Sequence, residues 1–287
     1  LRAMHWSLGE NDMMAYLSMM AVRLIELHRV RKATGSIFLH CDSTASHYLK
    51  ILMDSIFGAS NYRNEIIWKR VSTVKGNAGQ GSKFFGPNTD TILFYAKTDA
   101  STFNPIFADY SEDYLDNFYK YADFDGRRYR LISMIGPGGA AKGNPSYEFM
   151  GVTRYWRYSK KRMQELADAG MIVQSKAGNV PQRKLYLDEG KGVAAQSLWE
   201  GIEALSASSA ERLGYPTQKP LALLERIIAA ASNPGDVVLD PFCGCGTSIH
   251  AAQKLGRAWI GIDLTHLAIA LIERRLKDAF PGITYEV

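Results

Sequence analysis

The chain has 287 residues, of which 46% are hydrophobic, enough for one large core with or without an insert. No apolar run is long enough to span a bilayer and no signal peptide is visible, which argues against a membrane or secreted protein. The net charge of +5 is local, because residues 120–189 hold 13 Lys and Arg against 7 Asp and Glu. A basic block of this kind indicates a polyanionic partner.

The cysteines and the first residue bear on the setting of the chain. Its three cysteines have no disulfide spacing, which favours a reducing, cytoplasmic environment. The first residue is Leu1 rather than Met, which suggests a truncated or processed N-terminus.

Helical and strand patterns alternate in the first third of the chain. The predicted elements are a helix over 11–32, a strand over 36–41, a helix over 44–57, and strands over 65–68 and 91–96. This alternation is typical of a parallel or mostly parallel sheet. Residues 71–86, rich in Gly, Ser, Lys and Asn, are predicted to form a mobile loop.

The pattern changes between residues 101 and 205, where aromatic residues, Arg, Lys and Gly dominate and periodicity is weak. We interpret this stretch as an insert that is partly a small domain of its own. Regular patterning then returns with a helix over 220–231, a strand ending at 240, a helix over 248–255, a strand over 257–262 and a last helix from 265. We therefore expect residues 1–100 and 206–287 to form two halves of one doubly wound α/β sheet.

The most informative motif is the glycine-rich turn between the strand ending at Asp240 and the following helix. Glycines allow close backbone approach, and the helix N-terminus offers free N–H groups, so this turn predicts a nucleotide-type pocket. The position where a dinucleotide fingerprint wants a third Gly or Ala is Ile249, which weakens an NAD site. Asp263 follows Gly244 by 19 residues, the spacing at which a carboxylate meets ribose hydroxyls. An adenosine ligand without a pyrophosphate, S-adenosylmethionine above all, fits these features.

In such a pocket Asp240 would lie near the ammonium end of the ligand, Gly244 and Gly246 would give clearance, and Phe242 would supply an apolar wall. The alternative is an ordinary strand, turn and helix with a core Phe. Cys243 and Cys245 have the spacing of half a zinc site, but no second Cys/His pair stands at ligand spacing. Small residues lining the loop are therefore the preferred interpretation.

Several segments together resemble one family. They are residues 35–42, 64–69, 90–97, 215–220, 240–247 and 261–263. In this order the chain resembles the permuted (beta) class of S-adenosylmethionine-dependent DNA amino-methyltransferases. The resemblance implies a Rossmann-like, doubly wound mixed sheet of the class I methyltransferase type, circularly permuted, with double-stranded DNA as substrate. It also implies cofactor-binding roles for Asp240, Phe242, Gly244, Gly246, Thr247, Asp263, Thr217 and Lys219.

The catalytic tetrapeptide of that family, Asp/Asn-Pro-Pro-Tyr/Phe, does not occur in the sequence. It orients the target amino nitrogen and stacks on the flipped base, and in the permuted order it would lie just before Leu1. We therefore assign no catalytic residue and expect this chain alone to transfer methyl groups poorly or not at all. His40, on a strand expected to be buried, is interpreted as a core histidine rather than a base.

The resemblance implies that the basic insert reads the target sequence, since Arg and Lys neutralise phosphates and Arg can read base edges. The residues expected to contact DNA are Arg154, Arg157, Lys160 and Lys161. The alternative for them is a solvated amphipathic face. Tyr95 is a candidate to hold the flipped base, with a core tyrosine as the alternative. Lys75 and Lys83 of the predicted loop could close over DNA.

Three functions stay open on the sequence. The first is amino-methylation of DNA, with adenine preferred over cytosine because adenine is the commoner target in the family. The second is a catalytically inactive DNA-binding fragment or relative. The third is a dinucleotide oxidoreductase, which Ile249 disfavours. We expect no metal and no membrane partner, and the resemblance allows a homodimer.

Overall fold

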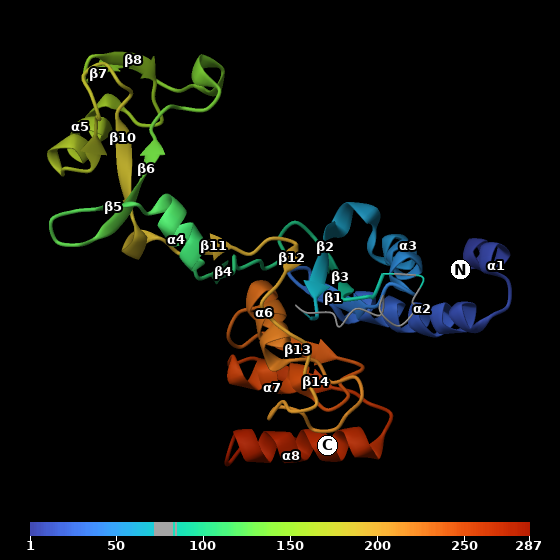
Figure 1. The fold of residues 1–287 in the computed structure, drawn as a ribbon. Helices are drawn as coiled ribbons and strands as arrows, with labels where there is room; N and C mark the ends of the chain where they lie inside the picture. The colour runs from blue at the N-terminus through green and yellow to red at the C-terminus, as the bar shows by residue number, and fades with distance from the viewer. Residues whose placement is uncertain (72–82, 84) are drawn as a thin grey trace. The chain divides into compact units, whose positions relative to one another are not determined.

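The structure, a computed structural model, describes residues 1–71, 83 and 85–287 (Figure 1). It divides into two compact units, the α/β unit (Leu1–Ile106 with Ala195–Val287) and the inserted unit (Phe107–Ala194). The inserted unit lies within the stretch 101–205 that the sequence predicts as an insert. The loop expected over 71–86, with Lys75, falls almost wholly outside the described residues. Within the described ranges, no helix is both long enough and apolar enough to cross a membrane.

The first sheet of the α/β unit has the order β1-β3-β2-β12. Its strands are β1 (Ser36–Cys41), β2 (Tyr62–Lys69), β3 (Thr89–Ala96) and the short β12 (Leu198–Trp199). β3 runs antiparallel to both β1 and β2, and only β12 is parallel to its neighbour β2. The prediction of a mostly parallel sheet for residues 11–97 is therefore wrong. β1 and β2 point the same way, but β3 returns between them, a topology that strand periodicity does not reveal.

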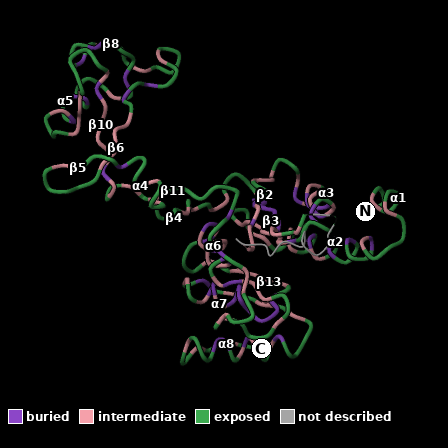
Figure 2. The backbone as a smooth tube through the Cα atoms, in the orientation of Figure 1, coloured by how far each residue is buried: buried purple, intermediate pink, exposed green. Residues whose placement is uncertain are grey.

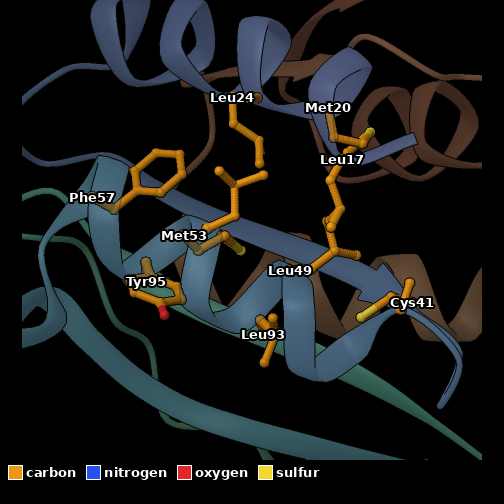
Figure 3. Packing of buried hydrophobic residues seen from close by; sticks show 12 residues of the cluster. Leu17, Met20, Leu24, Cys41, Leu49, Met53, Phe57, Leu93 and Tyr95 are labelled. Atoms are coloured by element: carbon orange, nitrogen blue, oxygen red, sulfur yellow. The ribbon is translucent and has the colours of Figure 1, made fainter. Parts of the chain in front are cut away.

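Both faces of this sheet are covered at β1 and β3, which is why the central residues of these two strands are continuous apolar runs rather than alternating ones. Helices α1 (Arg2–Leu8), α2 (Asp12–Val30) and α3 (Ser46–Phe57) come first in the chain, followed by the short helix η1 (Ala59–Asn61). Ile37 and Leu39 of β1 pack into a core on one face, where Leu24 of α2 points toward Met53 of α3 (Figure 3). Phe38 packs on the opposite face with residues of α6 (Leu221–Ala231).

The last part of the α/β unit contains β13 (Val237–Asp240), α7 (Thr247–Lys254), β14 (Ala258–Gly261) and α8 (His266–Ala279). Its two strands, β13 and β14, form a second sheet and are parallel. Leu224 of α6 contacts the core under the first sheet and also the cluster that holds Val238 of β13. One helix therefore packs against both sheets.

The inserted unit has its own core, built around the fully buried Trp156 and Met163. Its main sheet has the antiparallel order β5-β6-β10-β9, and β7 and β8 form a hairpin. The elements are β4 (Phe107–Ala108), α4 (Glu112–Phe118), β5 (Tyr121–Ala122), β6 (Arg128–Ser133), η3 (Gly139–Lys142), β7 (Ser146–Phe149), β8 (Val152–Tyr155), α5 (Lys160–Asp168), β9 (Ile172–Val173), β10 (Gln182–Tyr186), η4 (Leu187–Glu189) and β11 (Val193–Ala194). Buried stretches appear in this unit and in the α/β unit (Figure 2).

Candidate functional site

The glycine turn joins the end of β13 to the start of α7, as the sequence predicts. Gly244 and Gly246 have φ angles of 52° and 74°, in the left-handed region that side chains other than hydrogen rarely adopt. A Cβ on Gly246 would lie 2.7 Å from Ile272 Cγ1, and one on Gly244 would lie 2.9 Å from the ring of Tyr215. Both positions therefore require glycine because of the protein's own packing, whatever the ligand.

The two predicted carboxylates anchor opposite ends of this turn. Asp240 Oδ1 accepts a hydrogen bond of 3.0 Å from the Phe242 amide, and its Oδ2 accepts one from the Ser248 hydroxyl. Asp263 Oδ2 accepts one of 2.9 Å from the Gly244 amide. The acid 19 residues downstream thus contacts the glycine from which the spacing was counted.

Asp263 is held in its charged form by the backbone around it. Its Oδ1 accepts hydrogen bonds from the Thr265 amide at 3.0 Å and from the Thr265 hydroxyl at 3.1 Å. Burial alone would raise the pKa of Asp263, but the hydrogen bonds from the Thr265 and Gly244 amides bring that pKa below its ordinary value. The carboxylate therefore presents negative charge beside the turn at neutral pH.

Two hollows flank this carboxylate. A cavity of about 860 Å³ is lined by most of the residues predicted to bind a cofactor, namely Thr217, Lys219, Asp240, Phe242, Gly244 and Thr247. A second hollow of about 360 Å³ is lined by Tyr215, Pro216, Thr217, Thr265 and Leu267. Asp263 bonds to Gly244 on the wall of the first and to Thr265 on the wall of the second. The structure therefore brings six of the eight predicted cofactor residues to one cavity, whereas Gly246 and Asp263 line neither hollow and Asp263 contacts the walls only through Gly244 and Thr265.

A cluster of charged side chains lines the cavity, and the sequence analysis did not find it. The buried carboxylate of Asp90 lies 2.8 Å from His40 Nε2 and 3.2 Å from Arg70 Nε. Burial raises the pKa of Asp90, but His40, Arg70 and Lys219 outweigh it and leave the pKa below its ordinary value. His40 thus has a bonded partner, as a core histidine should, yet it also faces the cavity.

Arg275 of α8 is a second residue that the sequence did not point to. Its buried guanidinium donates to Thr247 Oγ1 at 2.9 Å, and it lies within 3.5 Å of both the Cys245 carbonyl oxygen and Glu211. Burial lowers the pKa of Arg275. The Arg275 side chain holds the start of α7 in place, and the Thr247 hydroxyl therefore already has a hydrogen-bond partner within the protein. No local spacing marks an arginine on a separate helix as part of the turn.

Of the remaining residues of the turn, Phe242 is exposed, whereas Cys243 and Cys245 are buried. The Phe242 ring is 47% exposed and lines the cavity, in agreement with an apolar wall for a ligand. Cys243 and Cys245 are buried free thiols, and burial raises the pKa of Cys243 to about 12. Among the described residues, no group of three or more His, Cys, Asp or Glu is arranged to hold a metal ion.

Tyr95 lies in the first core rather than at the cavity. Its side chain is fully buried, and its hydroxyl donates a 2.7 Å hydrogen bond to Asp54 Oδ1. Burial and this bond raise the pKa of Tyr95. Of the two interpretations offered by the sequence, a core tyrosine is the one that this position favours.

The four predicted DNA-contact residues lie in the inserted unit and are all exposed: Arg154, Arg157, Lys160 and Lys161. Two of them bond to main-chain carbonyls, Arg154 to its neighbour Thr153 and Arg157 to Ile135. In the part of the chain that the structure describes, none of the four forms an ion pair with an acidic side chain. Their charges are therefore available to a polyanion.

The fold and this turn together define an α/β domain with a glycine-rich turn and a cavity at the carboxyl end of the strand β13. Comparison with family models matches residues 6–274 to the DNA methylase family N6_N4_Mtase. The chain belongs to this family of DNA methylases.

Known relatives agree with that membership. The type II methyltransferase M.EcaI of Enterobacter cloacae is 33% identical over 265 residues, which are 91% of this chain and 57% of that protein. The chain spans about half the length of the curated relatives that it matches.

Solved structures share the fold. PvuII DNA methyltransferase, described as cytosine-N4-specific, gives a TM-score of 0.56 at 14% identity, covering 96% of this chain and 75% of that one. The protein TTHA0409 from Thermus thermophilus, solved in complex with S-adenosyl-L-methionine, gives a TM-score of 0.51 at 16% identity, covering 96% of this chain and 82% of that one. These similarities confirm the predicted class I methyltransferase fold, whereas its circular permutation stays a prediction.

Proposed function

We propose that the protein containing these 287 residues binds S-adenosylmethionine and moves its methyl group to an exocyclic amino group in double-stranded DNA. The observation that carries the proposal is the Asp263 carboxylate bonded to the Gly244 amide between two hollows. The Thermus relative in fold was solved with the same cofactor. We propose that the protein acts in the cytoplasm, the setting that its cysteine usage favours.

The hydrogen-bonding capacity of the site suits this cofactor. A carboxylate has about four lone-pair positions, and three of those of Asp263 are taken by Gly244 and Thr265. The Leu264 backbone also acts on this carboxylate, and we propose that a ribose hydroxyl joins the Gly244 amide at Oδ2. Asp240 uses two positions within the protein and keeps two for an ammonium group. The exposed Phe242 ring offers an apolar surface for the rest of the ligand.

The opposite charge is supplied by Lys219. Burial lowers the pKa of Lys219, while Asp90 acts in the other direction. Its Nζ donates to the Thr217 carbonyl oxygen at 3.0 Å and has two more donors. We assign Lys219 and Thr217 to the carboxylate end of the cofactor, beside the cavity wall that both residues line.

Methyl transfer to an amino group does not require these residues to act as acids or bases. When bound, S-adenosylmethionine would supply an electrophilic methyl group to the amino nitrogen, with S-adenosylhomocysteine as the leaving group and one proton lost from the nitrogen to solvent. Placement of the nitrogen in line with the sulfonium supplies most of the rate. The residues named above therefore bind and orient rather than exchange protons.

Calorimetric titration with S-adenosylhomocysteine and with NAD tests the cofactor. We expect one S-adenosylhomocysteine per chain and no heat with NAD, because the position of Ile249 leaves the turn without the third small residue that a dinucleotide fingerprint needs. Binding of NAD alone would overturn the proposal in favour of an oxidoreductase.

The catalytic tetrapeptide is not among the 287 residues, so methyl transfer requires further polypeptide. We expect the 287-residue chain to bind cofactor but to transfer labelled methyl groups to DNA only weakly, and robust transfer would contradict this. A second candidate, a DNA-binding protein without catalysis, is favoured by the same missing tetrapeptide. Absence of transfer by a longer form of the protein with its native flanking sequence would select it.

The finer properties of the activity are also proposals. We propose adenine as the target, with cytosine as the alternative, and mass analysis of digested product DNA separates N6-methyladenine from N4-methylcytosine. Sedimentation of the purified protein tests the homodimer that the family resemblance allows. We propose that the exposed basic residues of the inserted unit contact the DNA backbone.

A further inference from the structure

Two buried guanidinium groups, those of Arg257 and Arg275, lie in the described part of the α/β unit. A buried guanidinium is costly unless its donors find partners, so the partners show which segments the side chain holds together. Arg257 precedes β14 and donates to Ser232 and to the Leu255 carbonyl oxygen. The partners of Arg275 lie around the glycine turn, although neither arginine lines either of the two hollows.

The Arg275 guanidinium reaches several segments at once. Its Nη1 donates to Thr247 Oγ1 at 2.9 Å and lies 3.5 Å from the Cys245 carbonyl oxygen, at the end of the glycine turn. Its Nε donates to His250 Nδ1 of α7 at 3.1 Å. Its Nη2 lies 3.5 Å from Glu211 Oε1. The planar fork of an arginine presents donors in these several directions, which a lysine does not do.

The bond to His250 fixes the state of that ring. A guanidinium has no acceptor, so His250 Nδ1 is the acceptor and the ring proton lies on Nε2. Burial lowers the pKa of His250, and the charges of Arg275 and Lys254 lower it further. The ring nitrogens of His250 therefore report whether the guanidinium is in place.

Glu211 begins a loop over residues 211–221, here named the wall loop, whose ends are tied together. Glu211 Oε1 accepts a 2.7 Å hydrogen bond from the Leu221 amide at the start of α6. Gln218 closes the loop a second time, because its Oε1 accepts from the Leu213 amide at 2.8 Å and its Nε2 donates to the Glu211 carbonyl oxygen at 2.7 Å. Glu211 is therefore the point at which a force on one side chain moves the whole loop.

The wall loop supplies one side of both hollows. Thr217 and Lys219 line the larger hollow of about 860 Å³, and Tyr215 and Thr217 line both hollows. The Tyr215 ring packs so close to the glycine turn that a Cβ on Gly244 would lie 2.9 Å from it. The gap between the wall loop and the turn is thus narrow, and the ion pair that bridges the two lies outside the hollows.

We infer that Arg275 is a positioning residue for the cofactor site, which sets the distance between the wall loop and the glycine turn through its ion pair with Glu211. The inference rests on the proposed function, because it takes the ligand to be S-adenosylmethionine. A ligand that bonds to both the wall loop and the turn binds tightly only when the two are correctly spaced beforehand. Without the ion pair, ordering of the wall loop has to be supplied by the binding itself, and the Kd rises.

Calorimetric titration of the chain and its variants with S-adenosylhomocysteine tests the inference. Glu211→Gln is the sharpest variant, because its amide oxygen still accepts from the Leu221 amide while the charge that attracts Arg275 is gone. Arg275→Met removes the guanidinium and keeps an unbranched side chain. We expect the Kd to rise about 3- to 10-fold in Glu211→Gln and at least about 10-fold in Arg275→Met. The double variant should bind within about 2-fold of Arg275→Met, because both changes break one pair.

Arg257→Met is the matched control, since it removes the other buried guanidinium from the same unit. Its partners, Ser232 and Leu255, connect α6 to the end of α7 and include no residue of the turn or the wall loop. Whatever this variant does to the melting temperature, we expect its Kd for S-adenosylhomocysteine to stay within about 2-fold of that of the unchanged chain.

Nitrogen-15 NMR of His250 locates the effect. In Glu211→Gln the Nδ1 shift should stay that of an acceptor, because the guanidinium remains on α7, whereas in Arg275→Met it should change. Weaker binding in Glu211→Gln with an unchanged His250 signal assigns the loss to the link with the wall loop rather than to disruption of the turn.

Unchanged affinity in Glu211→Gln would overturn the inference, and this variant decides by itself where Arg275→Met does not fold. An equal loss of affinity in Arg257→Met would also overturn it, because the cause would then be general loosening of the unit. Failure of the unchanged chain to bind S-adenosylhomocysteine would reject the proposed function and this inference with it. The failure of the inference alone is therefore distinguishable, since it requires an unchanged chain that binds and variants that bind equally well.

Discussion

Replacement of Asp263 by Ala separates the two roles that the structure gives this carboxylate. Within the protein it accepts three hydrogen bonds, from the Gly244 amide, the Thr265 amide and the Thr265 hydroxyl. Hydrogen bonds to a charged group each contribute about 1.5–3 kcal/mol, but bonds that share one carboxylate are not additive and this one is partly exposed. We therefore expect Asp263→Ala to lower the free energy of unfolding by about 2 kcal/mol.

The same substitution should weaken S-adenosylhomocysteine binding. Loss of a charged acceptor for a ribose hydroxyl costs about 1.5–3 kcal/mol, which is about 10- to 150-fold in Kd. Thr265→Val is the control that keeps the charge: it removes the Thr265 hydroxyl bond to Asp263 and also the side-chain cap that this hydroxyl gives the Ala268 amide of α8. Urea unfolding and calorimetric titration of both variants measure the two effects. Unchanged affinity in Asp263→Ala would refute a ligand contact and leave the carboxylate a purely structural role.

Three further predictions follow from the geometry. Gly246→Ala should lower the free energy of unfolding by about 2–5 kcal/mol, because Ala is strained in the left-handed backbone region and its Cβ would overlap a side chain of α8. Gly235→Ala is the control in urea unfolding: Gly235 has a φ of 86° and a Cβ there would meet nothing within 4 Å, so this variant measures the backbone strain alone. Because the pKa of Asp90 is depressed below 3.8, its stabilisation is complete above that pH and is lost as pH falls through the folded pKa. Thermal unfolding of Asp90→Asn and the unchanged protein should therefore differ at pH 6, and the difference should begin to shrink only below pH 3.8 and vanish below the folded pKa of Asp90; a constant difference would contradict this. Lys160→Gln with Lys161→Gln should weaken DNA binding and reduce the salt slope by about 1.8 without lowering the melting temperature, and an unchanged slope would remove them from the interface.

The local features of the cofactor half were readable from the sequence because they depend on short-range chemistry. The turn needs glycine for its backbone angles, and the acid at the tip of the next strand is fixed by the length of one strand–helix–strand unit. These constraints act within about 25 residues, so spacing alone places Gly244 and Asp263 together.

Features that depend on packing between distant segments were not readable. Arg275 reaches the turn from a separate helix, α8. Asp90 of β3 bonds to His40 of the neighbouring strand β1. The antiparallel course of β3 between β1 and β2 leaves no periodic signal in the sequence. Tyr95 shows the limit most directly, since an aromatic residue at a strand end looks the same whether its hydroxyl faces a ligand or Asp54.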